Sequence, residues 1–157
     1  MFLGFLEVYT DAALLVVRVF LGMIMIVHGI PKIVGPARAQ MRAGMSQLGI
    51  HPILFDLVGL LEFFGGILLI AGLLTRLVSL LFALQMVGTI ILYISVLGRF
   101  VPPPEMLSQM VANSRRVMRG FVSGVGGWEF DLLILGVAIL LLIIGGGALS
   151  LDSLIGL

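Results

Sequence analysis

The chain has 157 residues, of which 61% are hydrophobic and only 11% are charged, and its mean hydropathy is +1.26. Soluble domains carry about 25% charged and roughly 45–50% apolar residues, so this composition excludes a soluble globular protein and indicates an integral membrane protein. The net charge is +1, no cysteine is present, and the basic residues gather in two loops. We therefore expect no nucleic-acid partner, no thiol chemistry and no cysteine-bound cluster.

The first apolar run spans residues 12–33 and follows an N-terminal stretch that contains no Lys or Arg. That stretch lacks the basic region of a signal peptide, so we expect the first span to remain in the mature protein. At about 100° per residue, the polar and glycine positions of this run share one helix face. This face carries Arg18, Gly22, Met25, Gly29 and Lys32, with His28 at its edge.

The second apolar run, residues 54–74, contains a single carboxylate, Glu62. Gly59, Gly65 and Gly66 lie within about 60° of Glu62 on a helix, and small residues let a neighbouring backbone approach closely in lipid. A carboxylate at membrane depth is costly unless it is paired or protonated. We therefore expect Glu62 to face a packed helix interface, opposite the polar face of the first span.

Two further runs complete a predicted bundle of four spans. After a tight connection at Thr75 and Arg76, the third span covers residues 77–97 and carries Gln85, and the prolines at 102–104 stop it. The fourth span covers residues 128–144 and begins with Trp128, which is typical of the membrane interface. The sequence therefore predicts an all-α fold, with residues 1–157 forming one transmembrane domain built as an integral-membrane four-helix bundle.

Two basic loops are candidates for interfacial amphipathic segments. In the first loop, Met41 and Met45 recur at helical spacing, although a plain basic loop fits the pattern equally well. In the loop after the third span, Arg115, Arg116 and Arg119 lie opposite an apolar stripe, which predicts a helix on the membrane surface. We expect this second segment to bind lipid headgroups or to dock a partner subunit.

The basic residues also predict the orientation of the chain. Residues 32, 38, 42, 99, 115, 116 and 119, all basic, follow the first and third spans, whereas the other connections and termini hold only Arg76. The positive-inside rule then places both long loops in the cytoplasm and both termini outside, with the protein in the inner (cytoplasmic) cell membrane as a multi-pass chain.

Depth along the spans groups the polar residues into two predicted clusters. With a rise of about 1.5 Å per residue, one cluster lies near the middle of the membrane and the other near its inner face. The first comprises Arg18, Glu62, Gln85 and His28. The second comprises Lys32, Glu129 and Asp131, with His28 as an alternative member of this cluster instead of the first. Only one of the two acids can face the bundle because they differ by about 200° on a helix.

The mid-membrane cluster has a functional and a structural interpretation. Arg18 and Glu62 have the chemistry of a proton relay or a quinone-head-group site, but they equally form a buried ion pair that fixes helix register. Because the two residues are offset by roughly 8–10 Å along the axis, Gln85 as intermediary or His28 as the true partner remains open. With only His28 and His51 as histidines, we expect no haem, metal or other prosthetic group in the isolated chain, and quinone is the one cofactor under consideration.

Five short motifs follow one another in a recognisable order and spacing. They read HGIPK at 28–32, EFFGG at 62–66, AGLLTR at 71–76, WEFDL at 128–132 and SLD at 150–152. Over nearly the whole chain this pattern resembles the DoxX family of small four-helix membrane proteins. The resemblance carries over the family's recurrent positions as Arg18, His28, Gly29, Lys32, Glu62, Gly65, Gly66, Gly72, Arg76, Glu129 and Asp152. Two departures are Gly145–Gly147, where relatives often have Gly-Pro-Gly, and an unusually long third loop.

The resemblance implies a redox-linked role in the membrane. Relatives are subunits of terminal quinol oxidase or thiosulfate:quinone oxidoreductase, or membrane parts of redox-stress complexes, and those that do thiol chemistry need cysteines. Since nothing here holds an electron securely, we predict no self-sufficient catalytic site. We predict an accessory or anchoring subunit of a respiratory, quinone-linked oxidoreductase complex, with membrane lipids and other membrane subunits as partners. Two alternatives are a redox subunit that itself contacts quinone or quinol, and a small proton or solute carrier.

Overall fold

The computed structural model describes residues 9–47, 49–95 and 128–157, and within them the secondary structure is helical. The helices are α1 (Thr10–Ile33), α2 (Arg38–Gln47), α3 (Pro52–Ala71), α4 (Thr75–Ser95), α6 (Trp128–Ile144) and α7 (Leu151–Ile155). Three of them, α1, α3 and α4, are long and apolar enough to cross a membrane. With 17 residues, α6 lies at the lower end of the length that spans a bilayer. The all-α membrane fold is therefore confirmed, and each predicted span overlaps one of these helices.

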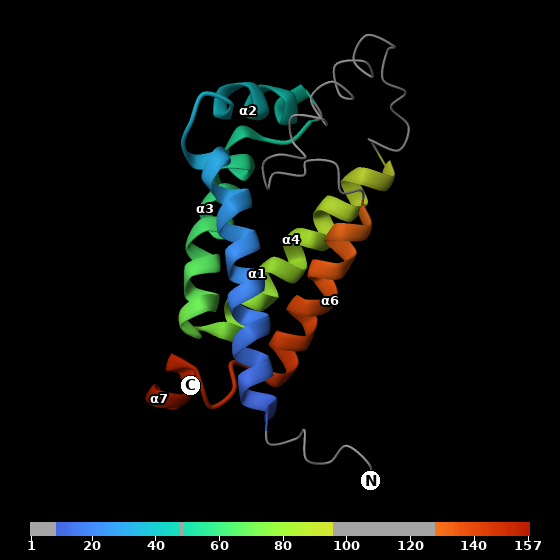
Figure 1. Cartoon of the computed structure of the whole chain (residues 1–157). Coiled ribbons are helices and arrows are strands. Elements are labelled where there is room, and N and C mark those ends of the chain that lie inside the picture. The colour runs from blue at the N-terminus through green and yellow to red at the C-terminus, as the bar shows by residue number, and fades with distance from the viewer. Residues whose placement is uncertain (1–8, 48, 96–127) are drawn as a thin grey trace, which may run out of the picture.

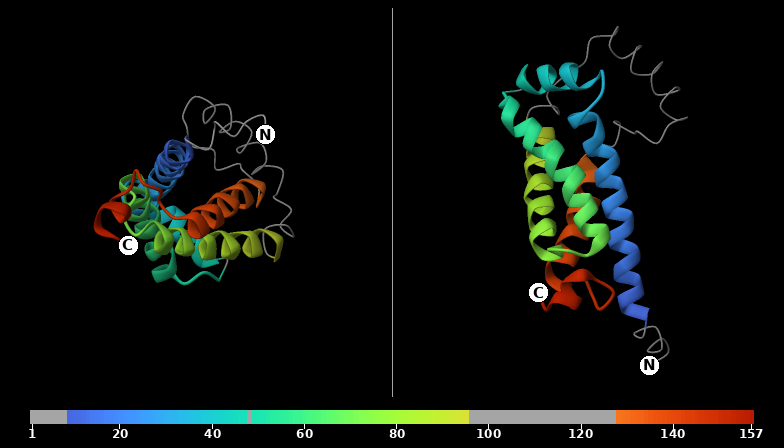
Figure 2. Two further views of the ribbon diagram at one scale, coloured as in Figure 1. Left: turned by 90° about the horizontal axis from the view of Figure 1, so that it is seen from below. Right: turned by 90° about the vertical axis from the view of Figure 1, so that its left-hand side faces the viewer.

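The four long helices run alongside one another, and the two short ones lie at opposite ends (Figure 1). We refer to these ends as the α2 end and the α7 end. Helix α1 packs chiefly on α3, and α4 packs chiefly on α6. In Figures 1 and 2, α4 and α6 tilt away from the other pair toward the α2 end. The bundle is thus built from two helix pairs that lie closest near the α7 end.

Glycines set the close approach of α1 and α3. A Cβ atom at Gly22 would lie 2.6 Å from the Gly66 carbonyl oxygen, and one at Gly29 would lie 2.6 Å from the Phe63 backbone nitrogen. Side chains larger than hydrogen would therefore push the two backbones apart. This contact confirms the predicted glycine-lined interface, and it places Glu62, which is only 3% exposed, inside it.

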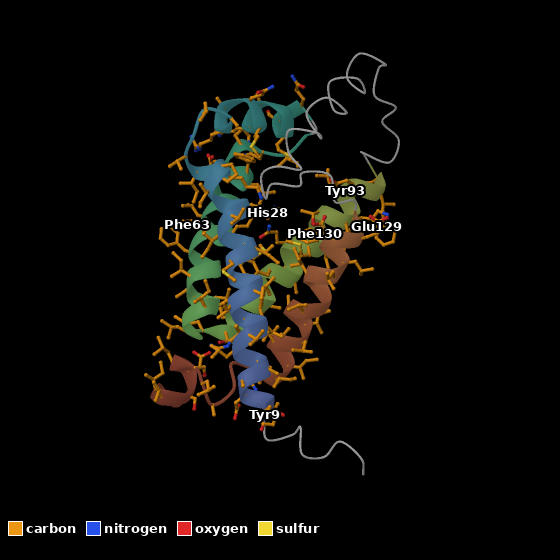
Figure 3. All side chains as sticks on the ribbon, viewed as in Figure 1. Tyr9, His28, Phe63, Tyr93, Glu129 and Phe130 are labelled. Carbon is orange, nitrogen blue, oxygen red and sulfur yellow. The ribbon has the colours of Figure 1, made fainter. Side chains whose placement is uncertain are left out.

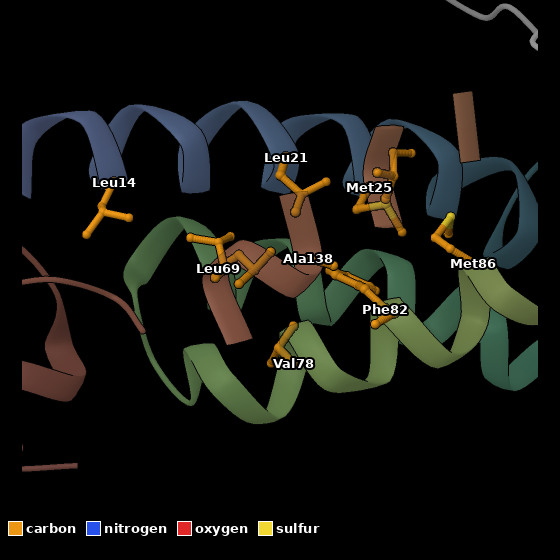
Figure 4. Packing of buried hydrophobic residues seen from close by; sticks show 11 residues of the cluster. Leu14, Leu21, Met25, Leu69, Val78, Phe82, Met86 and Ala138 are labelled. Atoms are coloured by element: carbon orange, nitrogen blue, oxygen red, sulfur yellow. The ribbon is translucent and has the colours of Figure 1, made fainter. Parts of the chain in front are cut away.

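The apolar core lies between the two helix pairs (Figure 4). Its buried members come from α1, α3, α4 and α6, namely Leu14, Leu21, Met25, Leu69, Val78, Phe82, Ala83, Met86, Ile134, Ala138 and Leu141. The outer faces of the same helices carry large apolar residues such as Phe64 and Ile143, which are 55% and 69% exposed. An apolar exterior around a packed interior is what a bundle surrounded by lipid requires.

The first basic loop folds as α2 and lies across one end of the bundle (Figure 1). Its two arginines do not project as free charges. Arg38 Nη2 lies 2.7 Å from one Asp56 carboxylate oxygen and Arg42 Nη2 lies 3.2 Å from the other. The first basic loop therefore forms the predicted helix and not a plain loop. The two ion pairs hold this helix against α3. The second predicted interfacial segment, with Arg115, Arg116 and Arg119, lies outside the described residues.

The separation of α2 and α7 gives a direct test of the predicted orientation. Ser46 in α2 and Ser153 in α7 are both exposed, and the chain has no cysteine of its own. In intact cells, a membrane-impermeant thiol reagent should label the Ser153→Cys variant and leave Ser46→Cys unlabelled, because both termini are predicted to lie outside. Both variants should react after the membrane is opened. Labelling of Ser46→Cys alone in intact cells would reverse the orientation.

Candidate functional site

Three helices bring charged and polar side chains together around Glu62. Lys32 Nζ of α1 contacts both carboxylate oxygens of Glu62 in α3. From α4, Gln85 Nε2 donates a hydrogen bond of 2.5 Å to Glu62 Oε1. We call Lys32, Glu62 and Gln85 the Glu62 cluster. Its carboxylate is paired on two sides, as a charge at membrane depth requires.

The predicted pairing of Arg18 with Glu62 is wrong. Glu62 lies level with Gly29 of α1, and Arg18 comes eleven residues earlier, a distance of roughly 16 Å along the helix. Helical side chains lean toward the N-terminus of their own helix, so Arg18 leans away from Glu62 toward the α7 end. Lys32 lies about one turn of α1 beyond Gly29, the level of Glu62, and its side chain leans back toward Glu62 for the same reason. Gln85, considered as an intermediary between Arg18 and Glu62, contacts Glu62 but does not connect it to Arg18 among the described residues.

The predicted inner cluster of Lys32, Glu129 and Asp131 does not form as one group, since Lys32 pairs with Glu62. Glu129 is exposed at the start of α6, whereas Asp131 is half-buried. The Asp131 carboxylate interacts with the Thr89 side chain of α4 and with the charges of His28 and Lys32. Only one of the two acids faces the bundle, as the helix geometry predicts.

His28 connects the Glu62 cluster to α6. Its imidazole is half-buried and stacks on the ring of Phe130, with ring centroids 5.8 Å apart and planes inclined by 25° (Figure 3). It also interacts electrostatically with Glu62, Lys32 and Asp131. His28 is therefore a neighbour of the Glu62 cluster but forms no ion pair with Glu62 in place of Lys32.

The Glu62 cluster contains one unused hydrogen-bond acceptor. Gln85 donates through its nitrogen to the Glu62 carboxylate, which fixes the direction of the amide. Its Oε1 atom is buried and has no hydrogen-bond partner among the described residues. The cluster thus combines a cation, a carboxylate and a free carbonyl oxygen. Within the described part of the chain, no group of His, Cys, Asp and Glu residues could hold a metal ion.

A second buried polar network, which the residue spacing does not predict, lies at the α7 end. The Asp152 carboxylate accepts hydrogen bonds from the backbone nitrogens of Leu74, at 2.6 Å, and Thr75, at 2.8 Å. The Asp152 backbone nitrogen donates to the Gly72 carbonyl oxygen at 2.9 Å. The fully buried Arg18 donates to the Leu149 carbonyl oxygen. We call Arg18 and Asp152, with the backbone groups they bind, the Asp152 network.

The charge of Asp152 is stabilised by this network. Burial alone would raise the pKa of the Asp152 carboxyl, but the hydrogen bonds from Thr75 and Leu74 and the Arg18 charge outweigh it and lower the pKa below its ordinary value. In the sequence, the SLD motif at 150–152 was the available sign of a short helix that carries Asp152. Ser150 begins α7 and its side chain accepts a hydrogen bond from the Ser153 nitrogen. Spacing alone did not show which residues Asp152 would meet.

Comparison with known proteins agrees with this architecture. The family model for DoxX matches residues 13–95, which is 83 of the 157 residues and covers α1 to α4. The chain is 36% identical over 77 residues to the protein named "Putative oxidoreductase CatD" of Bacillus subtilis (strain 168). That match covers 49% of this chain and 56% of the relative, so it spans little more than half of the relative's length. No solved structure matches the chain significantly. The chain belongs to the DoxX family.

Proposed function

We propose that this protein is a membrane subunit of a quinone-linked oxidoreductase complex and that its Glu62 cluster receives the quinone head group. The proposal is supported by membership of the DoxX family and by the similarity to a relative that is named as an oxidoreductase. It is supported further by the buried polar cluster itself, because ionisable residues inside membrane helices mark substrate and proton pathways.

The observation that carries the proposal is the unpartnered Oε1 atom of Gln85 beside the Lys32–Glu62 pair. A buried carbonyl oxygen without a donor is costly, and a quinol hydroxyl is a suitable donor for it. The Lys32 ammonium is in turn a donor for a quinone carbonyl oxygen. The cluster therefore offers a donor to the carbonyl oxygen of the oxidised quinone and an acceptor to the hydroxyl group of the reduced quinol.

The cluster is also placed to exchange protons. Reduction of a quinone to a quinol consumes two electrons and two protons. In this proposal the electrons come from a redox centre of a partner subunit, and the protons pass through Lys32 and Glu62. The Lys32 side chain is 18% exposed, whereas that of Glu62 is 4% exposed. Lys32 thus links the buried carboxylate to the aqueous phase at the α2 end.

The proposal is tested by purifying the tagged protein in mild detergent and measuring the quinone and the redox proteins that accompany it. The Gln85→Leu variant removes the free acceptor and should lower the quinone retained per protein about tenfold, the effect of one hydrogen bond of roughly 1.4 kcal/mol. Gln47→Leu, an exposed change in α2, should retain the parent amount. Equal quinone content in all three proteins, or the absence of any copurifying redox subunit, would contradict the proposal.

A further inference from the structure

A cavity of about 480 Å³ opens at the α7 end, away from the Glu62 cluster. Its walls come from the first turn of α4, the glycine turn after α6, and α7. The lining residues that matter here are Thr75, Arg76, Leu77, Ile144, Gly146 and Ser153. The lining contains no residue of the Glu62 cluster, so the cavity is separate from the proposed quinone site.

One wall of the cavity presents an arginine that no carboxylate in the described part of the chain neutralises. Among the described residues no carboxylate lies within 4.0 Å of Arg76, whose guanidinium makes only a long hydrogen bond of 3.4 Å to the Ile143 carbonyl oxygen. The Thr75 hydroxyl is fully buried and interacts with the Asp152 carboxylate, so it is not a second free donor of this wall. The Asp152 carboxylate does not neutralise Arg76, because it binds the backbone nitrogens of residues 74 and 75 and faces the Arg18 charge.

The glycine turn keeps the cavity open at this wall. A Cβ atom at Gly146 would lie 2.9 Å from Thr75 Oγ1 and 2.7 Å from Ser150 Cβ, so any side chain there would collide with this wall. Gly145 and Gly147 have φ angles of +88° and +74°, which favour glycine. The three glycines therefore shape a recess lined by Arg76 and by the Asp152 carboxylate, whose oxygens already accept hydrogen bonds from residues 74 and 75. Arg76 is the charged donor that remains for an anion.

The other wall of the cavity is apolar and continues into the lipid-facing surface. Leu77 of α4 and Ile144 of α6 are 52% and 50% exposed, and both lie at the ends of their helices that face α7. A free inorganic anion would leave this wall unused. A molecule with an anionic head and apolar chains matches both walls at once.

We infer that this cavity binds an anionic phospholipid from the leaflet on the α7 side of the membrane. The phosphate accepts hydrogen bonds from the Arg76 guanidinium, and the acyl chains follow Leu77 and Ile144. An arginine suits this ligand because its planar guanidinium forms paired hydrogen bonds with phosphate oxygens.

The test uses a fluorophore on Leu154→Cys, a position in α7 that is 79% exposed and is not part of the cavity lining. Because the chain has no cysteine, the label is specific. The labelled protein is reconstituted in vesicles that contain a fifth of the lipid as phosphatidylglycerol and the rest as phosphatidylcholine. Bromine atoms, which quench the fluorophore, are placed on the acyl chains of one lipid at a time. Equal lipid composition in both leaflets makes the orientation of the protein irrelevant.

We expect brominated phosphatidylglycerol to quench several-fold more than its share of the lipid predicts. Arg76→Gln should reduce quenching to that share, and Arg76→Lys should restore part of the preference lost in Arg76→Gln. Arg42→Gln, the same charge change at the α2 end, should keep the parent preference. Quenching in proportion to lipid content in the parent, or an unchanged preference in a folded Arg76→Gln variant, would overturn the inference. Loss of the preference in 20 mM phosphate, but not in chloride of equal ionic strength, would assign the site to a free oxyanion instead.

Discussion

Replacement of Lys32 with Met should destabilise the bundle by about 3–5 kcal/mol, the cost of leaving a buried charge without its partner. The Glu62 side chain is 4% exposed and would retain only the hydrogen bond from Gln85. Glu62→Leu should cost less, because the freed Lys32 lies in the last turn of α1 and its long side chain can extend to the interface. The difference between the two variants should appear in their unfolding midpoints in mixed detergent micelles.

The double variant Lys32→Met/Glu62→Leu provides the decisive control. Replacing both members of a buried ion pair with apolar residues of similar size is often neutral, so the double variant should recover most of the stability lost in Lys32→Met. If the double variant were as unstable as Lys32→Met alone, the loss would come from packing at the glycine-lined interface and not from the stranded charge. A Lys32→Met protein as stable as the parent would contradict the pairing itself.

Periodicity predicted the helices and the interface on which the Glu62 cluster depends. The glycines of α3 recur at helical spacing on one face of that helix, and the polar residues of α1 do the same on theirs. In the structure these two faces pack against each other at Gly22, Gly29 and Gly66. Periodicity gives the direction of a residue around the axis but not the reach of its side chain. Periodicity therefore favoured Arg18, whereas the partner of Glu62 is Lys32, because helical side chains lean toward the N-terminus of their own helix.

The Asp152 network could not be predicted from spacing. Asp152 lies 78 residues from Leu74 along the chain and binds it through a backbone nitrogen, which leaves no pattern in the sequence. The turn that receives it depends on Gly72, whose φ of +70° ends α3 and whose lack of a Cβ atom leaves room for the Arg18 guanidinium. Similarly, the stacking of His28 on Phe130 joins two helices whose relative position only the whole bundle determines.

The Glu62 cluster and the Asp152 network therefore connect different parts of the bundle. The Glu62 cluster joins α1, α3 and α4 in the half of the bundle where the helix pairs diverge. The Asp152 network joins α1, the turn between α3 and α4, and the chain around α7 at the opposite end. Changes at Asp152 should thus act on stability, whereas changes at Gln85 should act on the proposed quinone site.

Asp152→Ala should be the most damaging single change at the α7 end, with a loss of about 3–5 kcal/mol, because it removes two charge-assisted hydrogen bonds to backbone nitrogens and the negative charge that faces the buried Arg18. Glu129→Ala, which removes an exposed carboxylate from α6, should stay within about 0.5 kcal/mol of the parent. Unfolding midpoints at pH 7 in mild detergent measure both. An Asp152→Ala midpoint equal to that of Glu129→Ala would show that the network contributes nothing.

The same carboxylate should make stability depend on pH in a defined direction. The folded-state pKa of Asp152 is lowered, so its charge stabilises the fold fully above the unfolded-state value of about 4. That contribution should be lost as the pH falls from there through the lower folded-state pKa. Between pH 5 and pH 3 the midpoint of the parent should therefore fall more than that of Asp152→Asn, which has no charge to lose at this position. Parallel curves for the two proteins would mean that the charge of Asp152 does not stabilise the fold, and the hydrogen bonds to residues 74 and 75 would then have to act without it.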